Sequence, residues 1–213
     1  MSWIRTIAYA DATGRLKTLY DRIKGPDNNV DNIMMAHSLR PHSMEGHMAL
    51  YKYVLHHPAN TLPKWFLELV GVLVSQLNQC QYCVEHHSAG LRRLLQDDSR
   101  YRALIDALPG MDDGTAEGGP NLMALADAGL NPKEVGLLDY AATLTREPGA
   151  LSKAGVAQLR AAGADDGEIL EVNQVSAYFA YANRTVLGLG INTEGDVLGL
   201  SPGGEDPDSW EHQ

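Results

Sequence analysis

The chain has 213 residues, of which 44% are hydrophobic and 21% are charged. This length and this hydrophobic share suffice to bury one sizeable core, and they exclude a disordered chain of low hydrophobicity. Seventeen Lys and Arg residues stand against 27 Asp and Glu residues, so the formal net charge is −10. Such a surface repels phosphate groups, and we therefore expect neither nucleic acid nor an anionic membrane as a partner.

The apolar stretches of the chain are short. The N-terminal residues lack the uninterrupted apolar segment of a signal peptide. The longest apolar run, from about Trp65 to Leu77, contains Glu68 and is too short to span a bilayer. We expect a soluble, cytoplasmic protein in which residues 1–200 form a single domain. The acidic, Gly- and Pro-rich residues 201–213 are expected to form a disordered tail.

Helical periodicity dominates the sequence and sustained strand-like alternation is absent, so the predicted fold class is all-α. Asp98 and Ser152 are placed to cap helices, and the Gly-, Asp- and Pro-rich residues 109–121 predict a flexible connection. In chain order the predicted helices cover about residues 41–57, 63–78, 82–95, 99–108, 132–145 and 153–162, with a last one from Asp165 or Asp166 to Leu187.

Two of these helices open alike. The sequences PKWFLEL, from Pro63, and DGEILEV, from Asp166, both place a Glu after an apolar start. This likeness can indicate an internal duplication of a helical hairpin. It can equally arise by chance, because two amphipathic helices often look alike, and the sequence leaves both interpretations open.

Both cysteines of the chain lie close together, as Cys80 and Cys83. A disulfide between them would close a loop of only four residues and would stabilise the fold by roughly 1.9 kcal/mol, against about 3 kcal/mol for a fifteen-residue loop. The spacing therefore suits a reversible redox couple better than a structural crosslink, because one sulfur reaches the other with little backbone movement.

The surroundings of this pair also point to chemistry. Glu68 is the one side chain between Trp65 and Val84 that is charged by default, and a buried carboxylate must be hydrogen-bonded, paired or protonated. Cys83 and His87 are four residues apart and share a helical face. A Cys near a helix N-terminus with a His on its face has two reasons for a lowered pKa. Thiol and carboxylate can meet only if the chain turns back near Asn78.

The spacing Glu-x11-Cys-x2-Cys-x3-His, formed by Glu68, Cys80, Cys83 and His87, resembles the alkylhydroperoxidase D family within the carboxymuconolactone decarboxylase-like superfamily. The core of the motif covers residues 63–96. Within it, three further residues resemble that family: Ser75, Asn78 and Tyr82. The flanking sequences HSLRPHSMEGHMALY and LDYAATLT…AYFAYANRTVLGLG resemble its uncharacterised peroxidase-related branch, which extends the resemblance over most of the chain.

The resemblance implies an alkylhydroperoxidase D-like helical fold and a thiol peroxidase that uses neither metal nor other cofactor. Cys83 would attack an organic hydroperoxide and become a sulfenic acid, and Cys80 would resolve it to a disulfide. Glu68 and His87 would move the proton, with Ser75, Asn78 and Tyr82 in support. An external dithiol, such as a lipoyl-bearing protein, would reduce the disulfide. The resemblance also implies a homo-oligomer built from dimers, of which a hexamer is one example.

One departure concerns Tyr82, which stands where the founding branch of the family has a His. A Tyr can hydrogen-bond, but it cannot readily accept a proton near pH 7. Any proton-accepting role of that position is therefore absent from this chain.

Three other functions remain open. Cys80, Cys83, His87 and Glu68 are a plausible set of zinc ligands, although structural zinc sites usually join two separated ligand pairs. The superfamily also contains lactone decarboxylases, which are lyases that need no cysteine pair. A non-catalytic redox-sensing module is the third.

Other polar residues are interpreted structurally. His86 is expected to be a surface or hydrogen-bonded residue. Tyr178, Tyr181 and Asn183 are expected to pack in the core rather than line a pocket. We do not expect a metal site in the cluster of His37, His42, His47, His56 and His57.

Overall fold

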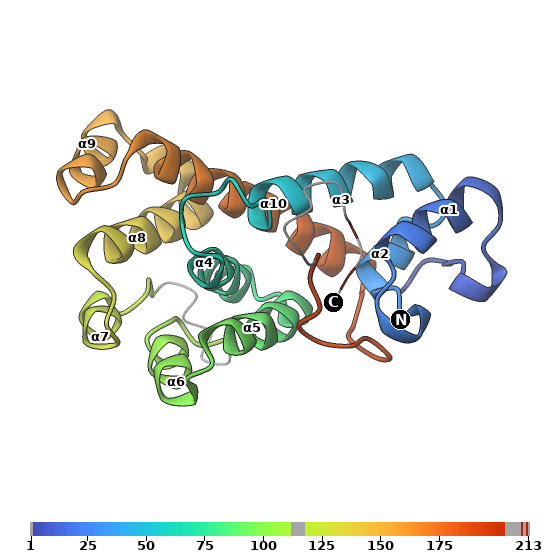
Figure 1. Cartoon of the computed structure of the whole chain (residues 1–213). Coiled ribbons are helices and arrows are strands. Elements are labelled where there is room, and N and C mark those ends of the chain that lie inside the picture. Colours follow the sequence, from blue (N-terminus) through green and yellow to red (C-terminus); the bar gives the residue numbers. More distant parts are fainter. Residues whose placement is uncertain (1, 112–117, 203–209, 211, 213) are drawn as a thin grey trace.

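The computed structural model describes residues 2–111, 118–202, 210 and 212 (Figure 1). The helices of these residues are α1 (Gly14–Ile23), α2 (Asn32–Ala36), α3 (Pro41–Leu55), α4 (Lys64–Leu77), α5 (Gln81–Leu95), α6 (Asp98–Asp106), α7 (Leu122–Asp127), α8 (Pro132–Arg146), α9 (Lys153–Ala161) and α10 (Asp166–Leu189). The described ranges contain no strand, apart from one isolated bridge between Pro202 and His212. Nor do they contain a helix long and apolar enough to cross a membrane. The all-α prediction is confirmed.

The predicted helices correspond to α3–α6 and α8–α10, with ends that differ by a few residues. Local capping explains several of these starts. Asn131 and Asp165 each form a capping box at the start of α8 and α10. The predicted cap of α6 was wrong by one residue: Asp97, not Asp98, accepts hydrogen bonds from two backbone amides of the first turn.

Three helices were missed by the sequence prediction. The helices α2 and α7 have five and six residues, too few to show a helical period. The helix α1 does bury one amphipathic face, through Leu16, Leu19, Tyr20 and Ile23, so its pattern was present in the sequence. Residues 112–117 of the predicted connection lie outside the described residues.

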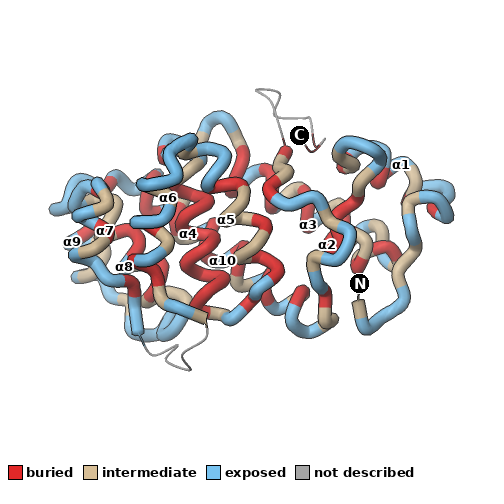
Figure 2. The backbone as a smooth tube through the Cα atoms, turned by 90° about the horizontal axis from the view of Figure 1, so that it is seen from below, coloured by how far each residue is buried: buried red, intermediate tan, exposed pale blue. Residues whose placement is uncertain are grey.

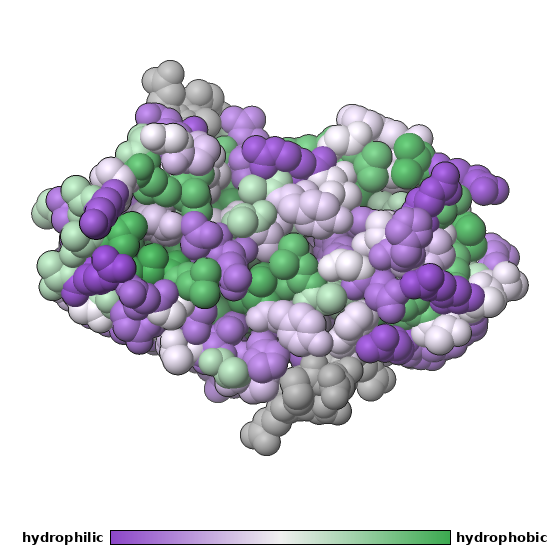
Figure 3. Space-filling model, turned by 90° about the horizontal axis from the view of Figure 1, so that it is seen from above, coloured by the Kyte–Doolittle hydropathy of each residue, from purple (hydrophilic) through white to green (hydrophobic). Residues whose placement is uncertain are grey.

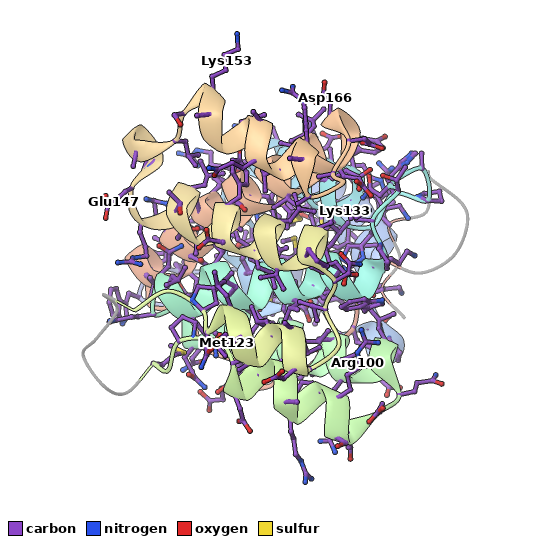
Figure 4. The ribbon with its side chains drawn as sticks, turned by 90° about the vertical axis from the view of Figure 1, so that its left-hand side faces the viewer. Arg100, Met123, Lys133, Glu147, Lys153 and Asp166 are labelled. Carbon is purple, nitrogen blue, oxygen red and sulfur yellow. The ribbon has the colours of Figure 1, made fainter. Side chains whose placement is uncertain are left out.

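The helix α4 is the centre of the fold. It contacts α3, α5, α8 and α10, and every residue from Phe66 to Leu77 is buried, which Figure 2 shows as a continuous buried stretch. Seen from one end, α10, α8 and α4 are stacked above α6 and α7, while charged side chains such as Lys153 point outward (Figure 4). This central position explains why the α4 sequence is apolar on nearly all sides.

Close packing of α4 against α10 depends on Gly71. A Cβ atom at this position would overlap the ring of Phe179, which in turn packs edge-on against the ring of His87, with ring centroids 4.6 Å apart. The two helices with similar sequences thus lie against each other. The internal duplication remains a prediction.

The segment after α10 returns to the middle of the molecule, beside α2 and the N-terminal residues (Figure 1). There Asp196 accepts a hydrogen bond from the backbone amide of Asn32, at 3.1 Å. In the predicted tail 201–213, Trp210 and His212 are buried against the rest of the protein. The prediction of disorder for 203–209, 211 and 213 lies outside the described residues.

We predict that Gly71→Ala lowers the free energy of unfolding by about 1–3 kcal/mol, because the added methyl group overpacks the interface with Phe179. The matched control is Gly46→Ala in the exposed middle of α3, where nothing lies within 4 Å of the added Cβ. This control should raise stability by up to about 1 kcal/mol, as Ala usually does in a helix. Urea denaturation followed by circular dichroism measures both, and equal effects would contradict the packing explanation.

Candidate functional site

The two cysteines lie at the turn between α4 and α5. Gln79 has a left-handed backbone (φ 56°), and the Cys80 amide donates a hydrogen bond to the carbonyl of Ser75 at 2.8 Å. Cys80 is the N-cap of α5, and Cys83 follows in its first turn. Both are buried and neither forms a disulfide. The chain therefore turns back after α4, as the motif requires.

The pKa values of the two thiols are shifted in opposite directions. The pKa of Cys80 is lowered, chiefly because the Cys83 side chain hydrogen-bonds to it, although burial opposes the shift. The pKa of Cys83 is raised well above its ordinary value by its hydrogen bond to Cys80 and by burial. The expectation of a lowered pKa for Cys83 was therefore wrong, because these two effects outweigh the helix N-terminus. The first proton to leave the pair comes from Cys80.

The buried carboxylate of Glu68 reaches across to α5. Nδ1 of His87 lies 2.7 Å from Oε2 of Glu68, a hydrogen-bond distance, and both side chains are nearly buried. With an ionised Glu68, Nδ1–H is the donor and Nε2 of His87 is the free acceptor. The opposite oxygen, Oε1, lies 3.8 Å from Nε2 of His56. Glu68 is thus flanked by two imidazoles, one predicted and one not.

A small cavity brings this pair and one thiol together. It holds about 40 Å³ of space for water-sized molecules, and its lining includes Cys83, Glu68 and His87, but not Cys80. At about 10–15 Å³ per water, it accommodates about three such molecules. The remaining lining residues are Asp31, Ile33, Met34, His47, Tyr51, Tyr82, His86, Gly90, Tyr178, Ala182, Gly199, Leu200 and His212.

Behind the thiols lies a network of amides. Nδ2 of the fully buried Asn183 donates to the Ser75 hydroxyl at 3.1 Å, and its Oδ1 accepts from Asn78 at 2.9 Å. The same side chain hydrogen-bonds to both cysteines and acts to lower their pKa. The structure thus brings Ser75 and Asn78 together near the thiols, as predicted. Asn183 itself was interpreted as core packing; the signal for its role was an amide among the small and apolar residues of the second half of α10.

Tyr178 and Tyr181 of α10 differ in their position relative to the cavity. Tyr178 lines the cavity, and its hydroxyl lies 3.1 Å from Nε2 of His47. Tyr181 is 41% exposed and does not line it. The packing interpretation therefore holds for Tyr178, which is buried in the core and also lines the cavity, and is wrong for the exposed Tyr181.

Tyr82 faces the segment that follows α10. Its hydroxyl donates to Oδ2 of Asp196 at 2.7 Å, and Nε2 of His86 lies 3.2 Å from the same oxygen. His86 is therefore hydrogen-bonded and buried, one of the two alternatives expected for it. Tyr82 thus lines the cavity while its hydroxyl is bound to Asp196.

Three buried histidines lie in or near the cavity: His47 and His212 line it, and His56 lies beside Glu68. Burial lowers the pKa of His47 to about 3 and that of His212 to about 4, and it holds the pKa of His56 well below its ordinary value. Each of the three has one buried ring nitrogen without a hydrogen-bond partner. No group of three or more His, Cys, Asp or Glu residues in the described part of the chain is arranged to hold a metal ion.

These imidazoles predict acid sensitivity. Below about pH 6.5 the unfolded chain binds protons at all three, whereas the folded chain does not, so stability falls by up to ~1.4 kcal/mol per pH unit for each. Asp31 offsets the contribution of one histidine. Burial raises the pKa of Asp31 from 3.8 to about 6, so on acidification the folded chain binds this proton before the unfolded chain does. The net expected loss is up to ~3 kcal/mol per pH unit between about pH 6 and pH 4.

Urea denaturation at several pH values measures this slope. His47→Gln should reduce it by up to ~1.4 kcal/mol per pH unit. His42→Gln, at an exposed position of the same helix, should leave it unchanged. A stability that does not vary from pH 7 to pH 5 would contradict the neutral, buried state of these residues.

Comparison with known proteins shows that part of the chain matches a known family. Residues 41–117 match the carboxymuconolactone decarboxylase family. No curated protein matches the chain. An uncharacterised peroxidase-related protein from Silicibacter sp. TM1040 has 25% identity and a TM-score of 0.62, over 76% of this chain and 75% of that one.

Two further solved structures share the fold. An uncharacterised peroxidase-related protein from Ralstonia eutropha JMP134, with an alkylhydroperoxidase core, has 20% identity and a TM-score of 0.69, over 92% of this chain and 93% of that one. A protein of unknown function from Agrobacterium tumefaciens has 20% identity and a TM-score of 0.51, over 72% and 92% of the two chains. The family match, which includes the whole motif from Glu68 to His87, and the shared fold support the resemblance of this chain to the alkylhydroperoxidase D and carboxymuconolactone decarboxylase-like superfamily.

Proposed function

We propose that the protein is a thiol-dependent peroxidase that reduces hydroperoxides, organic ones included, through a dithiol–disulfide cycle of Cys80 and Cys83. The observation that carries the proposal is the cavity: Cys83 lines it together with the Glu68–His87 pair, while Cys80 lies at hydrogen-bonding range of Cys83 but outside the lining. The peroxidase-related description of similar bacterial proteins supports the same reaction class.

The first step is a proton transfer within the thiol pair. Cys80 loses its proton more readily, and the Cys83 thiol donates a hydrogen bond to the sulfur of Cys80. When that proton passes to Cys80, the thiolate moves to Cys83, where a peroxide in the cavity can be attacked. The proton that the thiol pair gives up passes to Nε2 of His87 through water in the cavity, and the Glu68 carboxylate stabilises the resulting imidazolium.

The second step breaks the O–O bond. The Cys83 thiolate attacks the terminal peroxide oxygen and becomes a sulfenic acid, while the other oxygen leaves as an alkoxide. The alkoxide accepts a proton from the His87–Glu68 relay and departs as an alcohol. The Cys80 thiol then attacks the Cys83 sulfur, which forms the disulfide and releases water.

The cycle closes with an external reductant. The chain contains two cysteines, so the two electrons that regenerate both thiols must come from another molecule. A dithiol is suited to this exchange, and a lipoyl-bearing protein is the partner that we propose.

Mass spectrometry of the reduced protein tests this cycle. One equivalent of an organic hydroperoxide should remove both thiols within seconds and yield a peptide that links Cys80 to Cys83, and a dithiol should restore them. Cys83→Ser should abolish peroxide consumption, because the attacking sulfur is lost. Cys80→Ser should accumulate a sulfenic acid, because the resolving sulfur is lost.

Two further comparisons sharpen this test. Glu68→Gln keeps both cysteines but weakens the proton relay, and should slow thiol loss by about 10²-fold or more. Two thiols that persist for many minutes in the wild type would instead favour the lyase or the redox-sensing alternative. Turnover of Cys83→Ser at the wild-type rate would exclude Cys83 as the attacking residue.

We also propose that the protein assembles as a homo-oligomer built from dimers. The face of the molecule that carries α3 and α10 bears hydrophobic areas (Figure 3). Five large apolar side chains of these two helices are exposed: Leu50, Tyr53, Leu170, Tyr181 and Leu187. A contact between copies of this face would remove them from water.

Light scattering after size-exclusion chromatography measures this assembly. We expect an even multiple of the monomer mass, and we expect Tyr53→Asp to lower the mass because a charge would enter the interface. The matched variant Met123→Asp changes an equally apolar but 79% exposed residue of α7 and should leave the mass unchanged. A monomeric wild type would contradict the proposal.

A further inference from the structure

The C-terminal residues form part of the cavity wall. We define the C-terminal arm as residues 199–202 together with Trp210 and His212. Gly199, Leu200 and His212 line the same cavity as Cys83, and an isolated bridge pairs Pro202 with His212. His212 is 5% exposed, its Nε2 is buried without a partner, and its Nδ1 lies 3.8 Å from Oδ2 of Asp31.

Contacts outside the cavity hold the arm in place. Trp210 is buried, and the guanidinium of Arg22 lies over its ring, 3.9 Å from the centroid. On the other side, Arg93 donates to the Ser201 hydroxyl at 3.0 Å. Leu200 fits against Gly25, where a Cβ atom would lie only 2.8 Å from Leu200 Cδ1. The arm is thus anchored on α1 and α5 rather than by the cavity itself.

The anchored arm encloses the sulfur of Cys83. This residue is 2% exposed, and the space beside it accommodates about three water-sized molecules. Hydrogen peroxide or a short alkyl hydroperoxide fits this volume. A hydroperoxide with a phenyl ring next to its peroxide group, such as cumene hydroperoxide, does not fit while the arm is in place.

We propose that the C-terminal arm is the specificity-determining wall of this site, which admits hydrogen peroxide and short alkyl hydroperoxides and excludes bulky ones. The inference deepens the proposed peroxidase function and rests on it for the identity of the substrate. The exclusion itself is a property of the arm, and it can be measured without any peroxidase assay.

Access to Cys83 is measured by alkylation. In a Cys80→Ser background Cys83 is the only thiol, and its labelling in the folded protein is followed by mass spectrometry with a small reagent, methyl methanethiosulfonate, and a bulky one, N-phenylmaleimide. Trp210→Ala removes the anchor without touching the cavity lining. We expect the ratio of bulky to small labelling rates to rise at least tenfold, and likewise in a chain that ends at Ser209.

The matched control is Trp3→Ala, which removes a 79% exposed Trp that packs beside Gly190. Its ratio should equal that of the parent chain. Circular dichroism spectra that match the parent show that each variant is folded. If the bulky reagent labels the parent as readily as the small one, or if both arm variants leave the ratio unchanged within twofold, the arm does not control access.

Peroxidase turnover of the two-cysteine protein then separates the two proposals. We expect Trp210→Ala to raise the ratio of cumene hydroperoxide to hydrogen peroxide turnover at least tenfold. A changed labelling ratio with no turnover of any peroxide would overturn the peroxidase function and the substrate assignment, and would leave only the access role of the arm. Turnover with unchanged labelling and substrate ratios would overturn the arm and leave the peroxidase.

Discussion

A carboxylate in the middle of a fully buried helix is the constraint on which this structure depends. Glu68 is 2% exposed and cannot be left without partners, because an isolated charge in an apolar interior costs several kcal/mol. Its main partner, His87, comes from the next helix. The contact therefore fixes α5 against α4 across the turn at Gln79, and the same contact places the first turn of α5, with Cys83, beside the cavity. The hydrogen bond between Glu68 and His87 thus contributes both to the stability of the fold and to the geometry of the candidate site.

The two thiols show how burial and a neighbour can outweigh a helix terminus. A helix N-terminus favours a thiolate, and Cys80, at the N-cap, has the lowered pKa. Cys83 sits in the same turn, yet its thiol hydrogen-bonds to Cys80 and is buried, and its pKa is raised. The reactive position in the cavity therefore holds a protonated thiol at rest. Such a site attacks only after a proton has moved, which places the rate of the proposed reaction under the control of the pair rather than of one residue.

Local signals explain how much of this could be predicted from the sequence. The hairpin of α4 and α5, the cap of α8 at Asn131, and the approach of Glu68 to His87 all follow from residues within about twenty positions of one another. The roles of Asn183 and His212 could not be predicted in this way. Asn183 is more than 100 positions from the Ser75 that it binds, and His212 reaches the cavity from a segment of tail-like composition. Both depend on the packing of distant elements, which periodicity and capping do not encode.

The small volume of the cavity restricts the reduction step of the proposed cycle. Cys80 and Cys83 are both buried, so a disulfide between them would also lie beneath the surface. A small peroxide can reach Cys83 through a space of a few water molecules, but a reductant must bring its own thiolate into line with a sulfur–sulfur bond. A dithiol carried on a protein is far too large for that space. In the proposed cycle, oxidation of the thiols by a small peroxide therefore requires less opening of the cavity than reduction of the disulfide. The described residues of the arm contain no helix, and we expect that the arm can move without unfolding α4 or α5. In the proposed cycle, the site would accept a peroxide in its closed state and would admit the reductant only when the wall is displaced.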